Sequence, residues 1–329
     1  MKNAYLRIGL LLFILSMFGS WGFLVHRTVN QLAVYALPKS MQPFFYNNMK
    51  YLVEHSVRPD LRRNQDSSEA PKHFIDLEAF GDSAAWKMPV NWDEAVRQYT
   101  RDSLVKYGYV PYHIISIKNK LTDAFRSASK DSILFYAADL AHYIGDANVP
   151  LHTSLNYDGQ LTNQKGLHSL WESMIPELEI QRYDLYDRHK PKYLDQPEQE
   201  IWDGIRRAHL LLGDVLRQEI EATKAFTDST KFRVQERRGR EVKTFSPAFA
   251  LAYNERLGKT INEQLLYSAG MITDFWYTAW VDAGRPDLSS ITGSFEKKDK
   301  KAMKRELKTW RKNELISKGI LLAKKQAPE

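Results

Sequence analysis

The stretch AHYIGDANVPLH, residues 141–152, decides how this chain is expected to fold around a functional site. His142 and Asp146 lie four residues apart, so on a helix both side chains point to the same side. The residue before Pro150 is biased away from helical geometry, and we therefore expect the helix to end there. His152 can then turn back toward the first pair, so the stretch predicts three side chains around one metal site.

A second stretch, GLHSLWE at residues 166–172, repeats the four-residue offset with His168 and Glu172. Either pair alone is more often a surface ion pair or a hydrogen-bonded histidine in the core. Together, the two stretches place five histidine and carboxylate side chains within thirty-one residues, with apolar residues packed around them. This combination favours a metal site, and we interpret the chain as a zinc hydrolase.

The composition limits the chemistry of that site. The chain has 329 residues, enough for a full hydrophobic core, and no cysteine. Neither disulfides nor thiolate ligands are therefore available, and a metal must be held by nitrogen and oxygen ligands. The formal net charge of +7 suits a polyanionic substrate or an anionic membrane surface and identifies neither.

The 3.6-residue repeat of apolar side chains extends over most of the chain and predicts an all-α fold. Few alternating runs rich in Val, Ile and Thr are visible, and Pro and Gly mostly separate the helical stretches. The length alone allows one large domain or two modest ones, and we expect one multi-helix domain over residues 21–285. The helical stretches are 27–36, 92–106, 114–127, 133–144, 167–175, 198–225 and 246–280, and long loops are expected at 58–71, 153–166 and 183–197.

Residues 1–20 are typical of a secretory signal peptide, with Lys2 and Arg7 followed by an apolar run and small residues at the end. Cleavage after Ser20 would export the protein to a periplasmic, cell-surface or extracellular location. The alternative is an uncleaved N-terminal anchor, because the apolar run could extend through Val25 to nearly the length that spans a membrane.

The chain ends in a lysine-rich extension, residues 286–329, which we expect to be a solvated, partly helical appendage to the core. Its apolar residues could anchor a helix; they are Leu307, Trp310, Leu315 and Ile316. The alternative function for this extension is peripheral contact with anionic, phosphate-bearing surfaces.

Further candidate ligands lie nearer the start of the chain. If the signal is cut after Ser20, the free amine and the carbonyl of Trp21 could chelate a metal with His26 nearby. The alternative is that Trp21 is a packing residue and His26 lines or caps a helix. Asp60 and His73 could together complete a nitrogen and oxygen site of the kind zinc accepts, with Asp66 as the rival ligand.

These motifs carry a resemblance to a known family. The runs WGFLVH, KHFID, HYIGDANVPLH and GLHSLWE, with Asp60 between the first two, resemble the zinc-dependent phospholipase C and single-strand-specific zinc nuclease superfamily. The resemblance implies an all-helical fold of that type and three zinc ions. It assigns Trp21, His26 and Asp146 to one zinc, Asp60, His73 and His142 to a second, to which Asp146 bridges, and His152, His168 and Glu172 to the third.

The resemblance also implies hydrolysis of phosphodiester bonds, with a metal-bridging hydroxide as the nucleophile. Asp146 would be the central catalytic ligand because it joins two of the ions. Asp76 and Arg63 are candidates for proton transfer and phosphate positioning. Phe74, which follows a ligand histidine, is the candidate for stacking against a nucleobase.

Substrate choice divides the superfamily. Glu172 and the short loop between His152 and His168 resemble the phospholipases, and we therefore expect a phospholipase C-like enzyme acting on phospholipid head groups. The spacing of Trp21 and His26 resembles the nucleases, which makes a single-strand-specific endonuclease acting on DNA or RNA the alternative. A noncatalytic surface binding protein is a third reading. We expect the chain to be a monomer.

Overall fold

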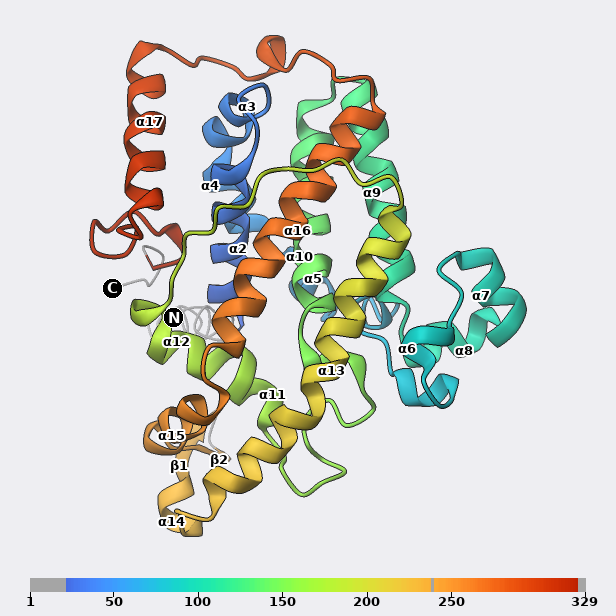
Figure 1. Ribbon diagram of the computed structural model, residues 1–329, viewed down its shortest axis with the longest axis vertical. Helices are drawn as coiled ribbons and strands as arrows, with labels where there is room; N and C mark the ends of the chain where they lie inside the picture. Colours follow the sequence, from blue (N-terminus) through green and yellow to red (C-terminus); the bar gives the residue numbers. More distant parts are fainter. Residues whose placement is uncertain (1–21, 238–239, 325–329) are drawn as a thin grey trace, which may run out of the picture.

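The computed structural model describes residues 22–237 and 240–324 (Figure 1). The expected signal peptide and the ligand candidate Trp21 lie outside the described residues. Within the described part, helices dominate, which confirms the expected all-α class as a mostly helical single domain. None of the described helices combines the length and the apolar character needed to cross a membrane. The helices are α2 (Phe23–Ala36), α3 (Gln42–Asn47), α4 (Met49–His55), α5 (Arg58–Arg62), α6 (Ala84–Lys87), α7 (Trp92–Tyr99), α8 (Arg101–Tyr107), α9 (Val110–Arg126), α10 (Lys130–Ala147), α11 (Leu167–Ser169), α12 (Ile175–Glu179), α13 (Pro197–Thr223), α14 (Asp228–Lys231), α15 (Pro247–Leu257), α16 (Thr260–Asp282) and α17 (Lys297–Arg311), and the strands are β1 (Phe232–Arg237) and β2 (Arg240–Phe245).

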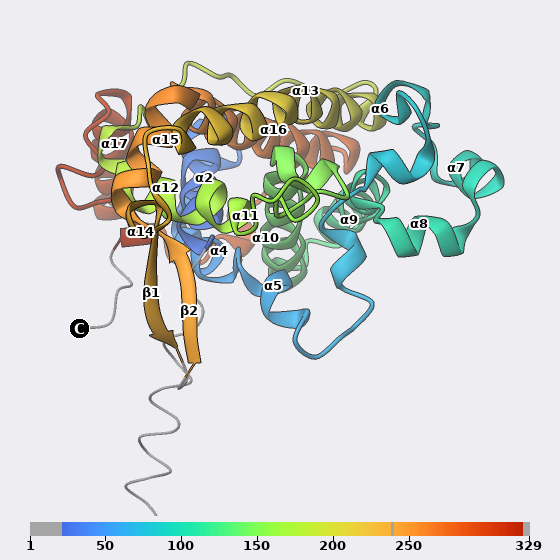
Figure 2. The ribbon, with the colours of Figure 1, turned by 90° about the horizontal axis from the view of Figure 1, so that it is seen from below.

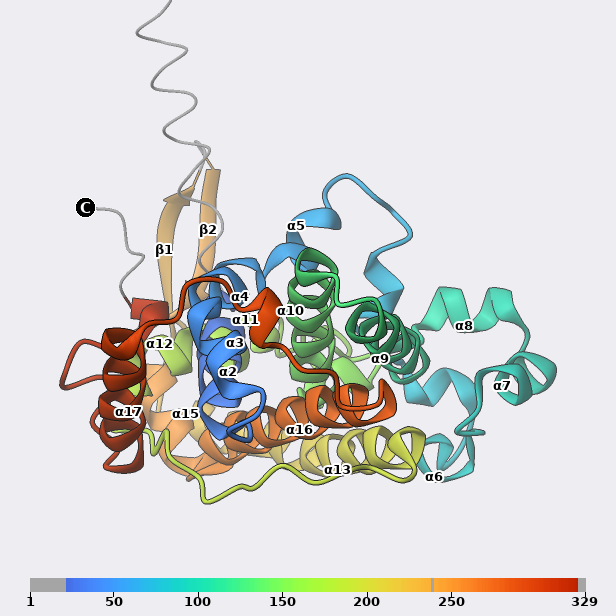
Figure 3. The same cartoon turned by 90° about the horizontal axis from the view of Figure 1, so that it is seen from above.

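The core lies among the long helices. Helix α16 packs against α2, α9 and α10, and α13 contacts α9, α10 and α15. Figure 3 shows α13 and α16 along the lower edge of the molecule, with α2 and α10 above them. The indoles of Trp202 and Trp276 are fully buried, and Trp276 donates a 3.0 Å hydrogen bond to the carbonyl of Ala137. This bond satisfies a buried polar atom and fixes α16 against α10.

Two of the expected helical stretches are interrupted. The stretch over residues 92–106 divides at Thr100, which has φ +64° and whose hydroxyl accepts from the amide of Ser103. The stretch over 246–280 divides at Gly258, with φ +61°. Both values lie outside the helical region, so each residue ends one helix before the next begins.

The sequence reasoning missed the β1–β2 hairpin. Its strands pair antiparallel, with Phe232 opposite Phe245, and the hairpin stands out from the helical body (Figure 2). Half of the residues in the two strands are charged, so the alternation of apolar and polar side chains that marks a half-buried strand is weak. The Phe245 ring stacks on Phe249 at 5.1 Å at the base of the hairpin, and Lys243 in β2 pairs with Asp228 of α14 at 2.7 Å.

The C-terminal extension is helical over α17 but lies against the body instead of in solvent. The expected anchors Leu307, Trp310 and Leu315 are buried, and the Trp310 indole donates a 2.7 Å hydrogen bond to the carbonyl of Leu185. The amide of Leu322 donates to Gln31 of α2 at 2.8 Å. The apolar side chains were thus correctly expected to anchor a helix, and their burial explains why the extension is packed rather than solvated.

Candidate metal centre

The structure brings the predicted ligands together in three groups. Each group offers three ligand atoms that lie within 4.8 Å of one another. The groups are His26, His142 and Asp146; Asp60, His73 and His142; and His152, His168 and Glu172. All eight described candidates from the sequence therefore meet at one end of α2 and α10, and the ninth, Trp21, precedes the first described residue.

Asp146 is the centre of this arrangement. It lies in the last turn of α10 and is 2% exposed. One carboxylate oxygen, Oδ2, lies 2.8 Å from His73 Nδ1 and 3.2 Å from His142 Nε2, and the other, Oδ1, lies 3.3 Å from His26 Nε2. The two oxygens therefore face two different groups, which is the geometry that a bridging carboxylate requires.

The turn after α10 positions the third group. The helix ends at Ala147, Val149 is extended with ψ 120°, and a 3-10 turn over Pro150–Thr153 carries His152 inward, as the proline predicted. His152 Nε2 lies 3.0 Å from His168 Nε2, which lies 2.6 Å from Glu172 Oε2. The stretch 167–175 was expected to be a regular α-helix, but Leu170–Met174 form a π turn. Such a turn is wider than an α-helical turn and is often found at functional sites.

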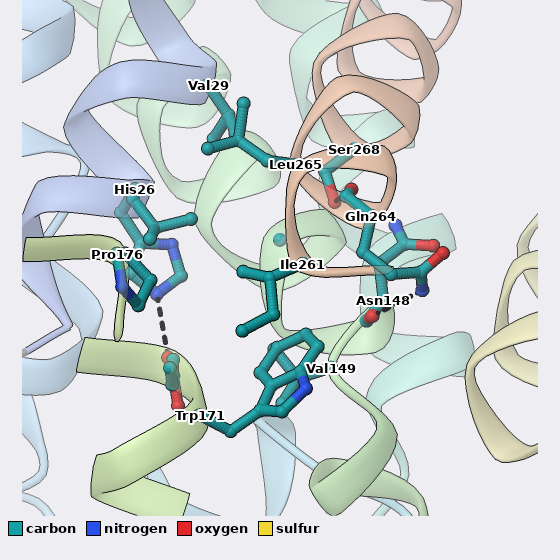
Figure 4. A pocket seen from close by; sticks show the side chains of 13 residues that line it. His26, Val29, Asn148, Val149, Trp171, Pro176, Ile261, Gln264, Leu265 and Ser268 are labelled. Carbon is teal, nitrogen blue, oxygen red and sulfur yellow. Dashed lines mark hydrogen bonds and ion pairs between the residues drawn. The ribbon is translucent and has the colours of Figure 1, made fainter. Parts of the chain in front are cut away.

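His26 joins the centre from α2. Its ring stacks on that of His142 with centroids 4.1 Å apart, and its Nε2 lies 3.7 Å from Glu172 Oε1. His26 and Glu172 both line a small cavity of about 30 Å³ with mostly apolar walls. Figure 4 shows the side chains around this cavity, with His26 on one side and Ile261, Leu265 and Gln264 on the other. Gly145 permits the close approach, because a Cβ atom there would lie 3.0 Å from His26 Nδ1.

Hydrogen bonds orient the remaining ring nitrogens. His142 Nδ1 lies 2.8 Å from the Ser56 carbonyl, and His152 Nδ1 lies 2.8 Å from the His73 carbonyl. A carbonyl only accepts, so these nitrogens carry the proton and leave Nε2 of both rings as a free lone pair for a metal. The backbone thus sets the tautomer that metal binding needs.

The His73 ring faces Asp146 with Nδ1 and a second buried carboxylate, that of Glu69, with Nε2. Its Nε2 makes no hydrogen bond and lies 3.7 Å from Oε1 of Glu69, which is 1% exposed. Lys72 at 2.7 Å, Arg62 at 3.2 Å and the Tyr143 hydroxyl hold that carboxylate in place. Glu69 is a residue that the sequence reasoning missed, although it precedes His73 by the same four-residue offset that marks the two ligand pairs.

The electrostatics of the cluster are those of a cation site. Burial opposes ionisation of Asp146, but the charges of His142 and His152 hold the pKa of this carboxyl well below its usual range. Burial likewise opposes protonation of His168, and the neighbouring Glu172 raises the pKa of this histidine above its ordinary value. The acceptor atoms converge so closely that protons or metal ions must lie between them, and the nitrogen and oxygen donor set fits zinc.

A cavity of about 390 Å³ opens onto the centre. Asp60, Asp146 and the third ligand group reach its wall, together with Arg63, whose Nη1 lies 3.6 Å from Asp60 Oδ1. The wall also contains two residues that the sequence reasoning did not consider, Phe23 and Asp158. Asp158 supports the site, since its carboxylate accepts a 3.3 Å hydrogen bond from the amide of His168.

Two predicted site residues lie elsewhere. Phe74 is half-buried, with its backbone and ring close against Gly108, and it does not line the cavity. Asp76 also lies outside the cavity wall, and burial together with the charge of Glu78 raises the pKa of Asp76 to about 7. The rival ligand Asp66 accepts the amide of Ser68 and belongs to none of the three groups.

Comparison with known proteins agrees with this geometry. No curated protein matches the chain. The family model described as S1/P1 Nuclease matches residues 21–266, a range that contains every predicted ligand. The match covers well over half of the sequence, and it favours the nuclease alternative over the phospholipase C-like reading that Glu172 and the short loop suggested. The chain belongs to the S1/P1 nuclease family of zinc-dependent phosphodiesterases.

Proposed function

We propose that this chain hydrolyses phosphodiester bonds in single-stranded nucleic acid at the centre around Asp146. The observation that carries the proposal is the convergence of three ligand groups on one cavity inside the region that matches the nuclease family. A phospholipase C-like activity becomes the alternative, because the matched family model is that of the nucleases.

The ligand sets would hold three zinc ions. His26 and Asp146 would hold one, with the amine and carbonyl of Trp21 if the chain is cut after Ser20. The second and third sets are Asp60, His73 and His142 with the bridging Asp146, and His152, His168 and Glu172. Bound zinc lowers the pKa of water and withdraws electrons from phosphoryl oxygens.

The chain's own residues would bind and orient the substrate. Arg63, whose side chain is 44% exposed, lines the cavity beside Asp60, where a guanidinium group can hold a phosphate oxygen. Phe23 also lines the cavity and is half-buried, so its ring is better placed than that of Phe74 to stack on a base. The carboxylates of Asp146 and Glu172 offset the positive charge that zinc and histidine bring together.

Export remains part of the proposal. Cleavage after Ser20 would convert the Trp21 amide nitrogen into a free amine with a lone pair, five residues before His26 in the sequence. The mass of the mature N-terminus tests this step. A chain that starts before Trp21 would remove the amine from the ligand set and leave that zinc with His26 and Asp146 alone.

A paired substrate assay tests the activity. The zinc-loaded protein is given single-stranded DNA, duplex DNA and phosphatidylcholine vesicles, each with and without a chelator. Rapid, chelator-sensitive cleavage of the single strand supports the proposal, and turnover of the lipid alone contradicts it. Asp60→Asn should abolish cleavage, whereas the matched control Asp66→Asn, which changes an exposed carboxylate six residues away, should leave it intact.

A further inference from the structure

A second concave surface lies away from the metal centre and is lined by residues of α17, the α2–α3 connection and the loop over residues 183–196. The course of these three segments can be followed in Figure 1. This groove, called here the α17 groove, has a volume of about 830 Å³. Six lysine and arginine side chains line it: Lys39, Arg188, Lys190, Lys300, Lys304 and Arg311. Three segments that are far apart in the sequence therefore supply one concentrated positive charge.

The charge of the α17 groove is not neutralised from within. All six side chains are exposed, and none of them forms an ion pair with another described residue. Asp187 is the one carboxylate in the wall. His189 also lines the groove, but its Nε2 is bonded to Asp274 at 2.8 Å. The groove thus holds six cations against one free anion, which is a strong attraction for a polyanion.

The walls of the groove are fixed by packing. Lys300 and Lys304 lie one turn apart on α17, so they point to the same side of the helix. The buried Leu307 and Trp310 hold α17 against the body, and the Trp310 hydrogen bond to the Leu185 carbonyl fixes the facing loop. The cations therefore occupy a preformed site rather than a flexible tail.

We propose that the α17 groove binds a segment of single-stranded nucleic acid outside the catalytic centre. The choice of occupant rests on the proposed nuclease function. A membrane surface fits less well, because none of the large apolar side chains exposed on the described surface lies in the groove, and stable attachment to a bilayer needs such groups. A concave surface lined by six cations instead matches the phosphate backbone of a flexible strand.

The groove is separate from the metal centre. Tyr35 lines the groove at one end of α2. His26, nine residues away at the other end of the helix, belongs to the metal centre. At a rise of 1.5 Å per residue the two lie about 14 Å apart along the helix axis. A long strand held in the groove stays near the metal centre at a raised local concentration, while a dinucleotide gains nothing from the groove.

Matched charge reversals on α17 test the proposal. The variant Lys300→Glu/Lys304→Glu/Arg311→Glu changes three cations of the groove. The control Lys297→Glu/Lys301→Glu/Lys308→Glu changes three exposed lysines with the same spacing on the same helix that do not line the groove. Both variants lower the net charge by the same amount, so only the position of the charges differs.

Binding is measured on the zinc-loaded full chain with a mirror-image 30-mer of thymidylate, which keeps the phosphates but is not a natural substrate. The groove variant should bind at least tenfold more weakly, and the slope of log affinity against log salt should fall by about 2, because three phosphate contacts are lost. The control variant should change little. Equal losses in both variants, or no loss in either, would overturn the proposal.

Two further measurements separate the possible failures. The groove variant should cleave a dinucleotide at the wild-type rate and a natural 30-mer with a raised KM, which places the defect outside the catalytic centre. If the enzyme proves inactive on nucleic acid, the binding measurement still decides whether the groove holds the strand. Loss of binding to phosphatidylserine vesicles, with unchanged binding to the strand, would assign the groove to a membrane and contradict the proposal.

Discussion

Replacing Glu69 by Gln removes the charge behind His73 while preserving the shape of the side chain. Glu69 is buried, and its carboxylate faces His73 Nε2 at 3.7 Å. Burial opposes its ionisation, but His73, Lys72 and the Tyr143 hydroxyl hold the pKa of Glu69 well below its usual range. When Nδ1 of His73 binds zinc, Nε2 carries the proton, and the negative charge beside it stabilises that state and fixes the ring.

The structure sets the expected size of the effect. Loss of a carboxylate partner of a metal-binding histidine weakens metal affinity by about 10- to 100-fold, which is about 1.4 to 2.7 kcal/mol. The variant also removes the anion paired with Lys72 and one of the two anions paired with Arg62, which keeps Asp139 at 2.8 Å. Their side chains are 18% and 30% exposed, so water compensates in part, and we expect a loss of about 1 to 3 kcal/mol in folding free energy.

Competition with a chromophoric chelator measures the zinc affinity, and thermal unfolding of the same sample measures stability. Asp139→Asn is the matched control, because Asp139 is buried in the same network and pairs with Arg58 and Arg62 but does not contact His73. It should destabilise the fold and retain the zinc affinity. Unchanged affinity in Glu69→Gln, or an equal loss in Asp139→Asn, would refute the reasoning.

Three other outcomes follow from the structure. Asp146→Asn should reduce zinc from near three ions per chain to near one, since its two oxygens face two groups; full zinc content and activity in this variant, measured by elemental analysis and strand cleavage, would be incompatible with the bridge. Because the folded chain keeps the Asp76 proton up to a pH of about 7 and the unfolded chain releases it near 4, stability should fall as pH rises between these values, and Asp76→Asn should flatten that slope in melting temperature. A slope that Asp76→Asn leaves unaltered would argue against the raised pKa. Trp310→Ala should lower the free energy of unfolding in urea by about 3 to 5 kcal/mol, because the indole is buried and its hydrogen bond is lost; a loss below 1 kcal/mol would mean that α17 detaches without affecting the body.

Local order made part of the site predictable. His142 and Asp146 share one helix face, and the proline after Val149 ends that helix, so their relation follows from the geometry of a single segment. The division at Gly258 was not predicted, because the stretch 246–280 was expected to be continuous, although glycine readily adopts the positive φ found there. The division at Thr100 was not predicted either, because a threonine at φ +64° is held there by its surroundings and not by its own preference.

The charged hairpin and the C-terminal extension show a different limit. The polar pattern of β1 and β2 hides their pairing, because backbone hydrogen bonds hold the ladder, and Phe232, Phe245 and Phe249 pack at its base. In the extension, Leu307 and Trp310 were visible as anchors, but the sequence did not reveal their partner surface. That surface is made by α2 and the loop that carries Leu185.

The sequence by itself determined the helical class and the absence of thiolate ligands, because these depend on composition and on the repeat of apolar residues within a segment. The candidate ligands came from the spacing within two segments and from the family resemblance of the motifs. Only the tertiary structure decided which atoms of Asp146 face His73 and His26, residues 73 and 120 positions away in the chain. It also decided that Glu69 lies behind His73, that Phe74 lies outside the cavity, and that distant cations meet in the α17 groove. Such contacts are set by the packing of α2, α10 and α16 around a common core, and they cannot be deduced from the spacing of residues along the chain.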